Sequence, residues 1–162
     1  MPAALPAERS RAHRPRAERA FVLYDGDCGL CTWLLAGLLR LDRAERLHPI
    51  ALQRPEADEL LADLAPAERL DSWHLISEAG VRFSAGAALV PLLELLPRGH
   101  ALAAPFARLP GITERCYRWT AQHRTQLSRL LGSGAKRRAG ERVRRRERAL
   151  ESPMQPPPGG ED

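Results

Sequence analysis

Apolar residues in the first half of this chain follow two spacings in turn. Residues 21–24 form a short apolar run of the kind that predicts a buried strand. From residue 28 to residue 42 they recur every three or four positions, which predicts an amphipathic helix. A second strand is expected at 47–53. Pro49 lies within it and lacks a backbone N–H, which favours the edge of the sheet.

The same spacings continue to residue 131. A short helix is expected at 56–64, and the apolar runs 73–76 and 81–83 predict a β-hairpin. Three further helices are predicted, at 86–96, 102–109 and 113–131. Pro91 lies inside the first of these, so that helix either begins near residue 90 or is kinked. Strands and helices in this order predict an α/β fold with helices on both faces of a sheet.

Basic residues gather at the two ends of the chain, whose formal net charge is +5. Residues 1–20 hold five arginines against two glutamates, and residues 136–162 hold eight basic residues against five acidic ones. The charge therefore says little about a binding face on the domain. Arginine, proline and glycine without regular apolar spacing predict disorder. We expect a disordered basic arm at 1–20, one domain at 21–132 and a disordered Arg/Pro-rich tail at 133–162.

The arginine run at 136–148 raises the question of a polyanionic partner. It could contact nucleic acid or an anionic membrane surface, but Glu141 and Glu147 interrupt it, which favours a solvated tail. The N-terminal segment has no apolar core typical of a secretion signal, and no run approaches the ~18 apolar residues that span a bilayer. With three cysteines and no such signal, we expect a soluble, cytoplasmic protein.

One stretch joins the first strand to the first helix and carries two cysteines. It reads YDGDCGLC over residues 24–31. Residues three apart share a helical face, so Cys28 and Cys31 can form a small disulfide ring. A helix N-terminus favours negative charge and lowers the pKa of a thiol there. This predicts Cys28 as the attacking thiolate and Cys31, one turn further in and more buried, as the resolving thiol.

Two carboxylates flank this pair. Asp25 could accept the proton of Cys31 during resolution, or Asp25 and Gly26 could simply make the turn before the helix. Asp27 is a candidate helix cap. A carboxylate beside Cys28 opposes formation of the thiolate, so Asp27 and the helix N-terminus act on the pKa of Cys28 in opposite directions.

A CxxC pair also occurs as half of a structural zinc site, and it can be two inert core thiols. Zinc would need two further ligands, but the sequence has no second CxxC and its histidines are scattered. Redox chemistry without a metal is therefore favoured. The third cysteine, Cys116, lies on a stripe with Ile112, Trp119, His123 and Leu127. At that spacing a cysteine is usually a small core residue, the alternative being a third thiol that relays the active-site disulfide.

The motif at 24–31 resembles that of the DCC family of thiol-disulfide oxidoreductases, a DUF393-type group. Two later segments agree with this resemblance. Residues 83–89 resemble the family's Gly-x-x-Ala element, and residues 109–131, which include Tyr117 and Arg124, resemble its C-terminal helix. The resemblance covers roughly 21–132. It implies a thioredoxin-like three-layer fold with a C-terminal helical extension, a dithiol active site and no cofactor.

Thioredoxin-like folds also suggest where a substrate would bind. Such proteins often bind a peptide or glutathione backbone near the start of their last core helix, which makes Gly86 a candidate. The alternative is that Gly86 only allows close packing of helix and sheet. These proteins place a cis-proline before the third strand, whereas this chain has LDSW at 70–73. Ser72 or Asp71 would occupy that place, so Ser72 joins Asp27 and Gly86 as a candidate substrate-binding residue.

The expected function is thiol-disulfide exchange through the dithiol. Its partners would be a disulfide-containing substrate and a thiol carrier that reduces the protein again. The alternative from another class is a non-catalytic interaction module, which would keep the fold and bind a partner through its helical extension and basic tails. Reversible cycling between dithiol and disulfide separates the two, because only the catalytic reading requires it.

Overall fold

The computed structural model describes residues 19–151. Most of the predicted N-terminal arm, and the last part of the predicted tail from residue 152, lie outside this range. One mixed sheet forms the centre, with strand order β2-β1-β3-β4. Its strands are β1 (Ala20–Tyr24), β2 (Leu47–Ala51), β3 (His74–Ser77) and β4 (Arg82–Ser84). β1 is parallel to β2 and antiparallel to β3, and β2 lies at the edge, as Pro49 predicted.

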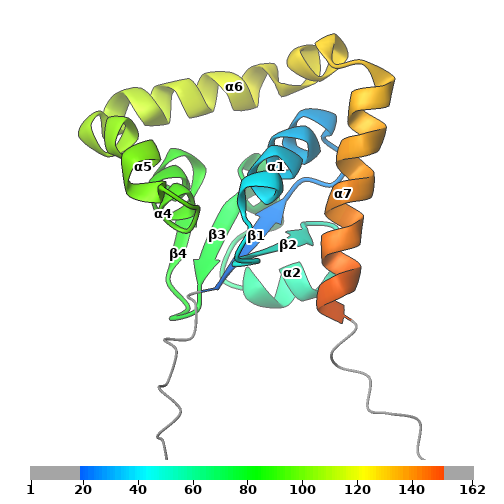
Figure 1. The fold of residues 1–162 in the computed structure, drawn as a ribbon, viewed down its shortest axis with the longest axis horizontal. Helices are drawn as coiled ribbons and strands as arrows, with labels where there is room; N and C mark the ends of the chain where they lie inside the picture. The colour runs from blue at the N-terminus through cyan, green and yellow to red at the C-terminus, as the bar shows by residue number, and fades with distance from the viewer. Residues whose placement is uncertain (1–18, 152–162) are drawn as a thin grey trace, which may run out of the picture.

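Helices make up most of the remaining described chain (Figure 1). They are α1 (Gly29–Leu41), α2 (Pro55–Leu60), α3 (Pro66–Asp71), the 3-10 turn η1 (Ala85–Ala88), α4 (Leu89–Glu94), α5 (Gly99–Arg108), α6 (Pro110–Leu130) and α7 (Ser133–Glu151). Pro91 lies in the first turn of α4, where no intrahelical bond needs its missing N–H, so the helix begins near residue 90 rather than being kinked. None of the helices in the described range is long and apolar enough to cross a membrane.

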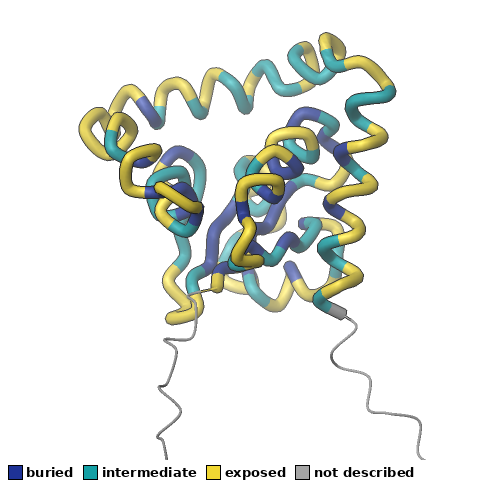
Figure 2. Tube along the Cα trace, in the orientation of Figure 1, coloured by how far each residue is buried: buried dark blue, intermediate teal, exposed yellow. Residues whose placement is uncertain are grey.

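The sheet is covered on both faces, which gives three layers. On one face, Val22 and Leu75 pack with Leu35 of α1, and this larger core also takes in residues of α4, α5 and α7. On the other face, Leu23 and Ile76 pack against α2 and the loop after it. Figure 2 shows the buried positions gathered on the strands and the facing side of α1. Alternate residues of β1 thus serve opposite faces, as a strand requires.

The predicted disordered tail at 133–162 is wrong for its described part, because residues 133–151 form α7. Ala139 and Val143, one helical turn apart, are buried in the larger core and are 5% and 1% exposed. The Tyr24 hydroxyl donates to Glu147 Oε1 at 3.1 Å, and Arg146 Nη2 donates to the Asp42 carbonyl at 3.2 Å. The arginine run thus lies on a docked helix whose apolar stripe is only about one residue wide. Such a stripe gives a weak sequence pattern.

Candidate active site: a dithiol at the start of a helix

The site begins with a tight turn between β1 and α1. The Cys28 N–H donates to the Asp25 carbonyl at 3.2 Å, and the Asp27 N–H donates to Asp25 Oδ1 at 3.0 Å. Asp25 therefore makes the turn with its side chain, as aspartate commonly does. This turn sets Cys28 at the N-cap of α1 with extended backbone angles. The predicted cap, Asp27, lies one residue too early for that position.

Cys28 caps its helix through sulfur. Its Sγ accepts the Cys31 N–H at 3.2 Å. The Cys31 thiol hydrogen bond and the backbone N–H groups of Cys31 and Leu30 lower the pKa of Cys28 to about 6, against the opposing effects of burial and the Asp25 charge. The same thiol hydrogen bond, burial and the negative charges of Cys28 and Asp25 raise the pKa of Cys31. The pair is thus strongly asymmetric: Cys28 ionises near neutral pH and Cys31 stays protonated.

The expectation that Cys31 is the more buried residue is wrong. Cys28 is 9% exposed, whereas Cys31 is half-buried. The C-terminal helices approach closely at the residue after Cys28: a Cβ placed on Gly29 would lie 2.7 Å from Ser128 Oγ and 2.9 Å from Lys136 Cδ. Side chains of α6 and α7 therefore rest against the start of α1, and glycine at position 29 leaves room for them.

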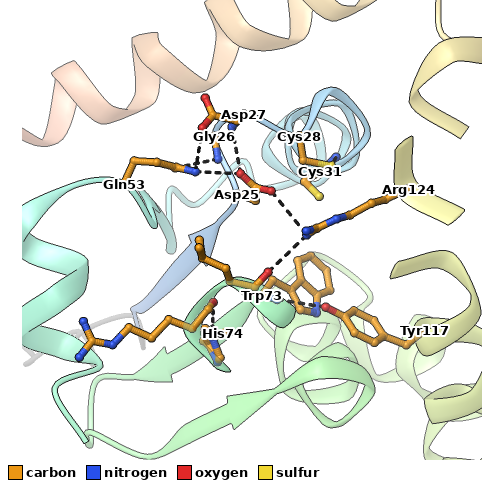
Figure 3. A network of polar contacts seen from close by, with 12 residues as sticks. Asp25, Gly26, Asp27, Cys28, Cys31, Gln53, Trp73, His74, Tyr117 and Arg124 are labelled. Carbon is orange, nitrogen blue, oxygen red and sulfur yellow. Dashed lines mark hydrogen bonds and ion pairs between the residues drawn. The ribbon is translucent and has the colours of Figure 1, made fainter. Parts of the chain in front are cut away.

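Asp25 lies beside the dithiol between two polar partners (Figure 3). Its Oδ1 accepts Gln53 Nε2 at 2.8 Å, and its Oδ2 faces Arg124 Nη1 at 3.5 Å. The side chain of Asp25 is 16% exposed. Asp25 is thus both a turn residue and a half-buried carboxylate close to the thiols, whose pKa values its charge affects.

Gln53 and Arg124 are functional neighbours that sequence reasoning did not place in the site. Gln53 follows β2, which runs parallel to β1, so the C-terminal ends of both strands lie side by side. The predicted strands could therefore have placed Gln53 next to the turn that follows β1. Its amide also accepts the Gly26 N–H at 3.0 Å, which fixes the turn from the other side. Arg124 comes from α6, about 100 residues away in sequence, and no local pattern points to it.

An aromatic pair closes the site on the side of β3. Tyr117 of α6 stacks on Trp73 with ring centroids 6.2 Å apart, and its hydroxyl accepts the Trp73 N–H at 3.0 Å. Burial raises the pKa of Tyr117 to about 12, and the nearby Cys31 charge contributes to this. Arg124 Nη1 also donates to the Leu70 carbonyl at 3.4 Å. Side chains of α6 therefore contact the segment 70–73, which stands where thioredoxin-like proteins have a cis-proline.

Among the described residues, neither Ser72 nor Gly86, two of the predicted substrate-binding residues, forms a hydrogen bond with Cys28 or Cys31. Ser72 is the half-buried C-cap of α3, and no hydrogen bond joins it to the dithiol within the described chain. The Gly86 N–H donates to Glu114 Oε2 at 3.0 Å, and a Cβ there would lie 2.9 Å from the Glu114 Cα. These contacts favour the packing interpretation of Gly86 and leave its N–H occupied.

The expectation of a core position for Cys116 is wrong. Cys116 is exposed on α6, and its stripe neighbours Ile112 and Trp119 are 53% and 56% exposed. The spacing does follow a helix, but the N-terminal part of the stripe, at Ile112, Cys116 and Trp119, is exposed, while His123 and Leu127 are half-buried. Trp119 stacks on His123 of the same helix, with ring centroids 4.5 Å apart.

A hollow of about 300 Å³ opens beside Cys28. Its lining residues come from the turn, the start of α1 and the last turns of α6: Asp25, Asp27, Cys28, Gly29, Arg124, Thr125, Ser128 and Arg129. The third predicted binding residue, Asp27, is therefore one of the residues that line the hollow beside Cys28. Within residues 19–151, no group of three or more His, Cys, Asp or Glu residues is placed to hold a metal ion.

A four-stranded sheet between helices, with a dithiol at the start of the helix after its first strand, defines a thioredoxin-like protein, here extended by C-terminal helices. The comparison with protein families identifies one family within this class. The chain belongs to the DCC1-like thiol-disulfide oxidoreductase family, whose model matches residues 22–130. This membership indicates a thiol-disulfide oxidoreductase type of function. No curated protein and no solved structure matches this sequence.

Proposed function

We propose that this protein is a thiol-disulfide oxidoreductase in which Cys28 attacks and Cys31 resolves. The observation that carries the proposal is the place of Cys28 at the N-cap of α1, where its Sγ accepts the Cys31 N–H at 3.2 Å. In keeping with this geometry, the pKa of Cys28 falls to about 6 while that of Cys31 rises. A thiolate is the attacking form in thiol-disulfide exchange. At neutral pH, Cys28 therefore supplies a nucleophile and Cys31 holds a proton until it is needed.

The reaction balances as a two-electron exchange. The Cys28 thiolate attacks one sulfur of the substrate disulfide, forms a mixed disulfide and releases the other half as a thiolate. Cys31 then loses its proton and attacks the Cys28 sulfur, which closes the Cys28–Cys31 disulfide and releases the second half. The substrate gains two electrons and two protons as two thiols. A dithiol carrier reverses this oxidation of the protein, and we place the cycle in the cytoplasm, where such carriers keep thiols reduced.

Asp25 is the base that we assign to the second step. Its charge acts on both thiols, and it is the half-buried carboxylate next to them. Gln53 and Arg124 hold the two oxygens of its carboxylate from opposite sides. A carboxylate fixed in this way can take the Cys31 proton as the mixed disulfide resolves.

The test is a redox titration of the purified protein in glutathione buffers, with the Cys28–Cys31 disulfide followed by mass. We expect a reversible two-electron transition that Cys28→Ser abolishes. Cys116→Ser is the matched control, because this exposed thiol lies outside the site, and the transition should persist in it. Absence of the disulfide at every buffer ratio would contradict the proposed function and favour a non-catalytic module.

A further inference from the structure

The hollow beside Cys28 has two unlike walls. Thr125, Ser128 and Arg129 line it from α6, and Asp27 lines it from the turn. Spacings of three and four residues put the α6 side chains on one face of that helix. With Arg124, which also lines the hollow, the wall from α6 carries two hydroxyls and two guanidinium groups, all of them hydrogen-bond donors.

Three of these donors, on Thr125, Ser128 and Arg129, have no hydrogen-bond or ion-pair partner within the part of the chain that the structure describes. Arg124, the other cation of the hollow, faces Asp25 and the Leu70 carbonyl. Arg129 forms no ion pair with any residue from 19 to 151, and the side chains of Thr125 and Ser128 donate no hydrogen bond there. Lys136 of α7 is a third cation close by, since its side chain lies against Gly29 at the same helix start.

Access to Cys28 is narrow. The residue is 9% exposed, and the hollow of about 300 Å³ is where its surface is reached. That volume holds on the order of ten water-sized groups, which is enough for half of a small disulfide. Two further side chains of α6 lie close to the dithiol (Figure 3): Tyr117 contacts Trp73, and Arg124 contacts Leu70 and also lines the hollow. Small disulfides therefore fit this site better than those of folded proteins.

We propose that the hollow binds a low-molecular-weight disulfide that carries a carboxylate close to its sulfur, with Arg129 as the residue that binds this carboxylate. The inference rests on the proposed function and names its substrate class. A guanidinium and neighbouring hydroxyls match the acceptors of a carboxylate, and Lys136 and the start of α1 favour negative charge at the same place. Asp27 on the opposite wall keeps a second negative group away from the turn.

The test measures how fast reduced protein is oxidised by three disulfides of similar length and different charge. They are 3,3′-dithiodipropionate with two carboxylates, 2-hydroxyethyl disulfide without charge, and cystamine with two ammonium groups. Each second-order rate constant is divided by that of the same probe with 2-mercaptoethanol, which removes intrinsic reactivity. We expect the dicarboxylate to have the highest ratio, and Arg129→Ala to lower that ratio about tenfold, the equivalent of ~1.4 kcal/mol. The ratio for the uncharged probe should change less than about twofold.

Arg115→Ala is the matched control, an exposed arginine of α6 outside the hollow, and it should leave all three ratios unchanged. Equal ratios for the three probes, or an equal effect of Arg129→Ala on each, would overturn the proposed substrate class while the oxidoreductase function stands. A protein that none of the probes oxidises at Cys28 would overturn both. The salt dependence gives a second readout, since only the dicarboxylate rate should fall as ionic strength rises.

Discussion

The segment β1–α1 and the helices α6 and α7 meet at the dithiol, but they are built differently. α1 buries Leu30, Leu35, Ala36 and Leu39 against the sheet. In α6, all of whose residues are described, Thr113 alone is buried, and α7 docks through Ala139 and Val143. The first region supplies the sulfurs, and the second supplies the side chains around them. In the proposed function, reactivity thus resides in the packed core, while the side chains proposed to select a substrate lie on helices with little burial.

Of the predicted effects, the largest should be the loss of stability when the packing of α7 against the domain is disrupted. Val143→Asp places a carboxylate at a position that is 1% exposed, and an unpaired buried charge costs about 3–5 kcal/mol. We expect the free energy of unfolding, measured in urea, to fall by about that amount. Arg142→Asp puts the same group one residue earlier, at an exposed position, and should cost less than about 1 kcal/mol. Equal stability of the two variants would mean that α7 is not part of the folded unit.

The contrast between the regions also explains what the sequence could predict. Strand β1, helix α1 and the dithiol between them follow from a dense apolar pattern and a specific motif, and the structure has them within a residue or two of the predicted bounds. α7 was missed because arginines surround the two apolar residues that dock it. Arg124 and Arg129 were not assigned to the site because their places depend on how α6 crosses the domain, which is a long-range property.

The pKa of Cys28 can be measured to test whether the core region alone makes this thiol reactive. Its pKa of about 6 means that protonation below pH 6 removes the nucleophile, so reactivity is lost as pH falls and is nearly complete at pH 7. Alkylation of Cys28 by uncharged iodoacetamide, followed by mass, should rise about tenfold per pH unit below pH 6, roughly a hundredfold from pH 4 to the plateau. Glutathione alkylated in parallel is the reference, as its ordinary thiol keeps gaining reactivity above pH 8. A Cys28 midpoint near 8.5 would remove the asymmetry on which the proposed mechanism depends.

A substitution at the contact between η1 and α6 can show whether Gly86 serves packing or substrate binding. Gly86→Ala puts a Cβ 2.6 Å from Glu114 Oε2 and 2.9 Å from its Cα, so α6 must shift. We expect a loss of about 1–3 kcal/mol in urea unfolding, the usual cost of overpacking. Gly111→Ala is a suitable control, since a Cβ at that position of α6 meets nothing within 4 Å. If Gly86→Ala kept full stability but slowed oxidation by 2-hydroxyethyl disulfide, Gly86 would be a substrate-binding residue after all.

Arg124 joins the two regions directly, and its removal should have a smaller effect confined to the second step of the reaction. Arg124 lowers the pKa of Cys31 and faces Asp25 at 3.5 Å, with its own side chain 35% exposed. An ion pair this exposed contributes at most ~1 kcal/mol, which corresponds to about a fivefold change in rate. With 4,4′-dithiodipyridine the first thiopyridone reports attack by Cys28 and the second reports resolution by Cys31. Arg124→Ala should slow the second release about fivefold and leave the first within about twofold.

Two further variants decide how Arg124 acts on that step. Arg124→Lys keeps the charge and should restore part of the second rate, because the effect on Cys31 is electrostatic. Arg118→Ala removes an arginine of the same helix that pairs with Glu114 at 3.2 Å, and it should change neither release. If Arg124→Ala instead slowed both releases equally, α6 would be needed for the reactivity of Cys28 itself. The proposal that β1–α1 alone sets the reactivity of Cys28, while α6 and α7 only select the substrate, would then be wrong.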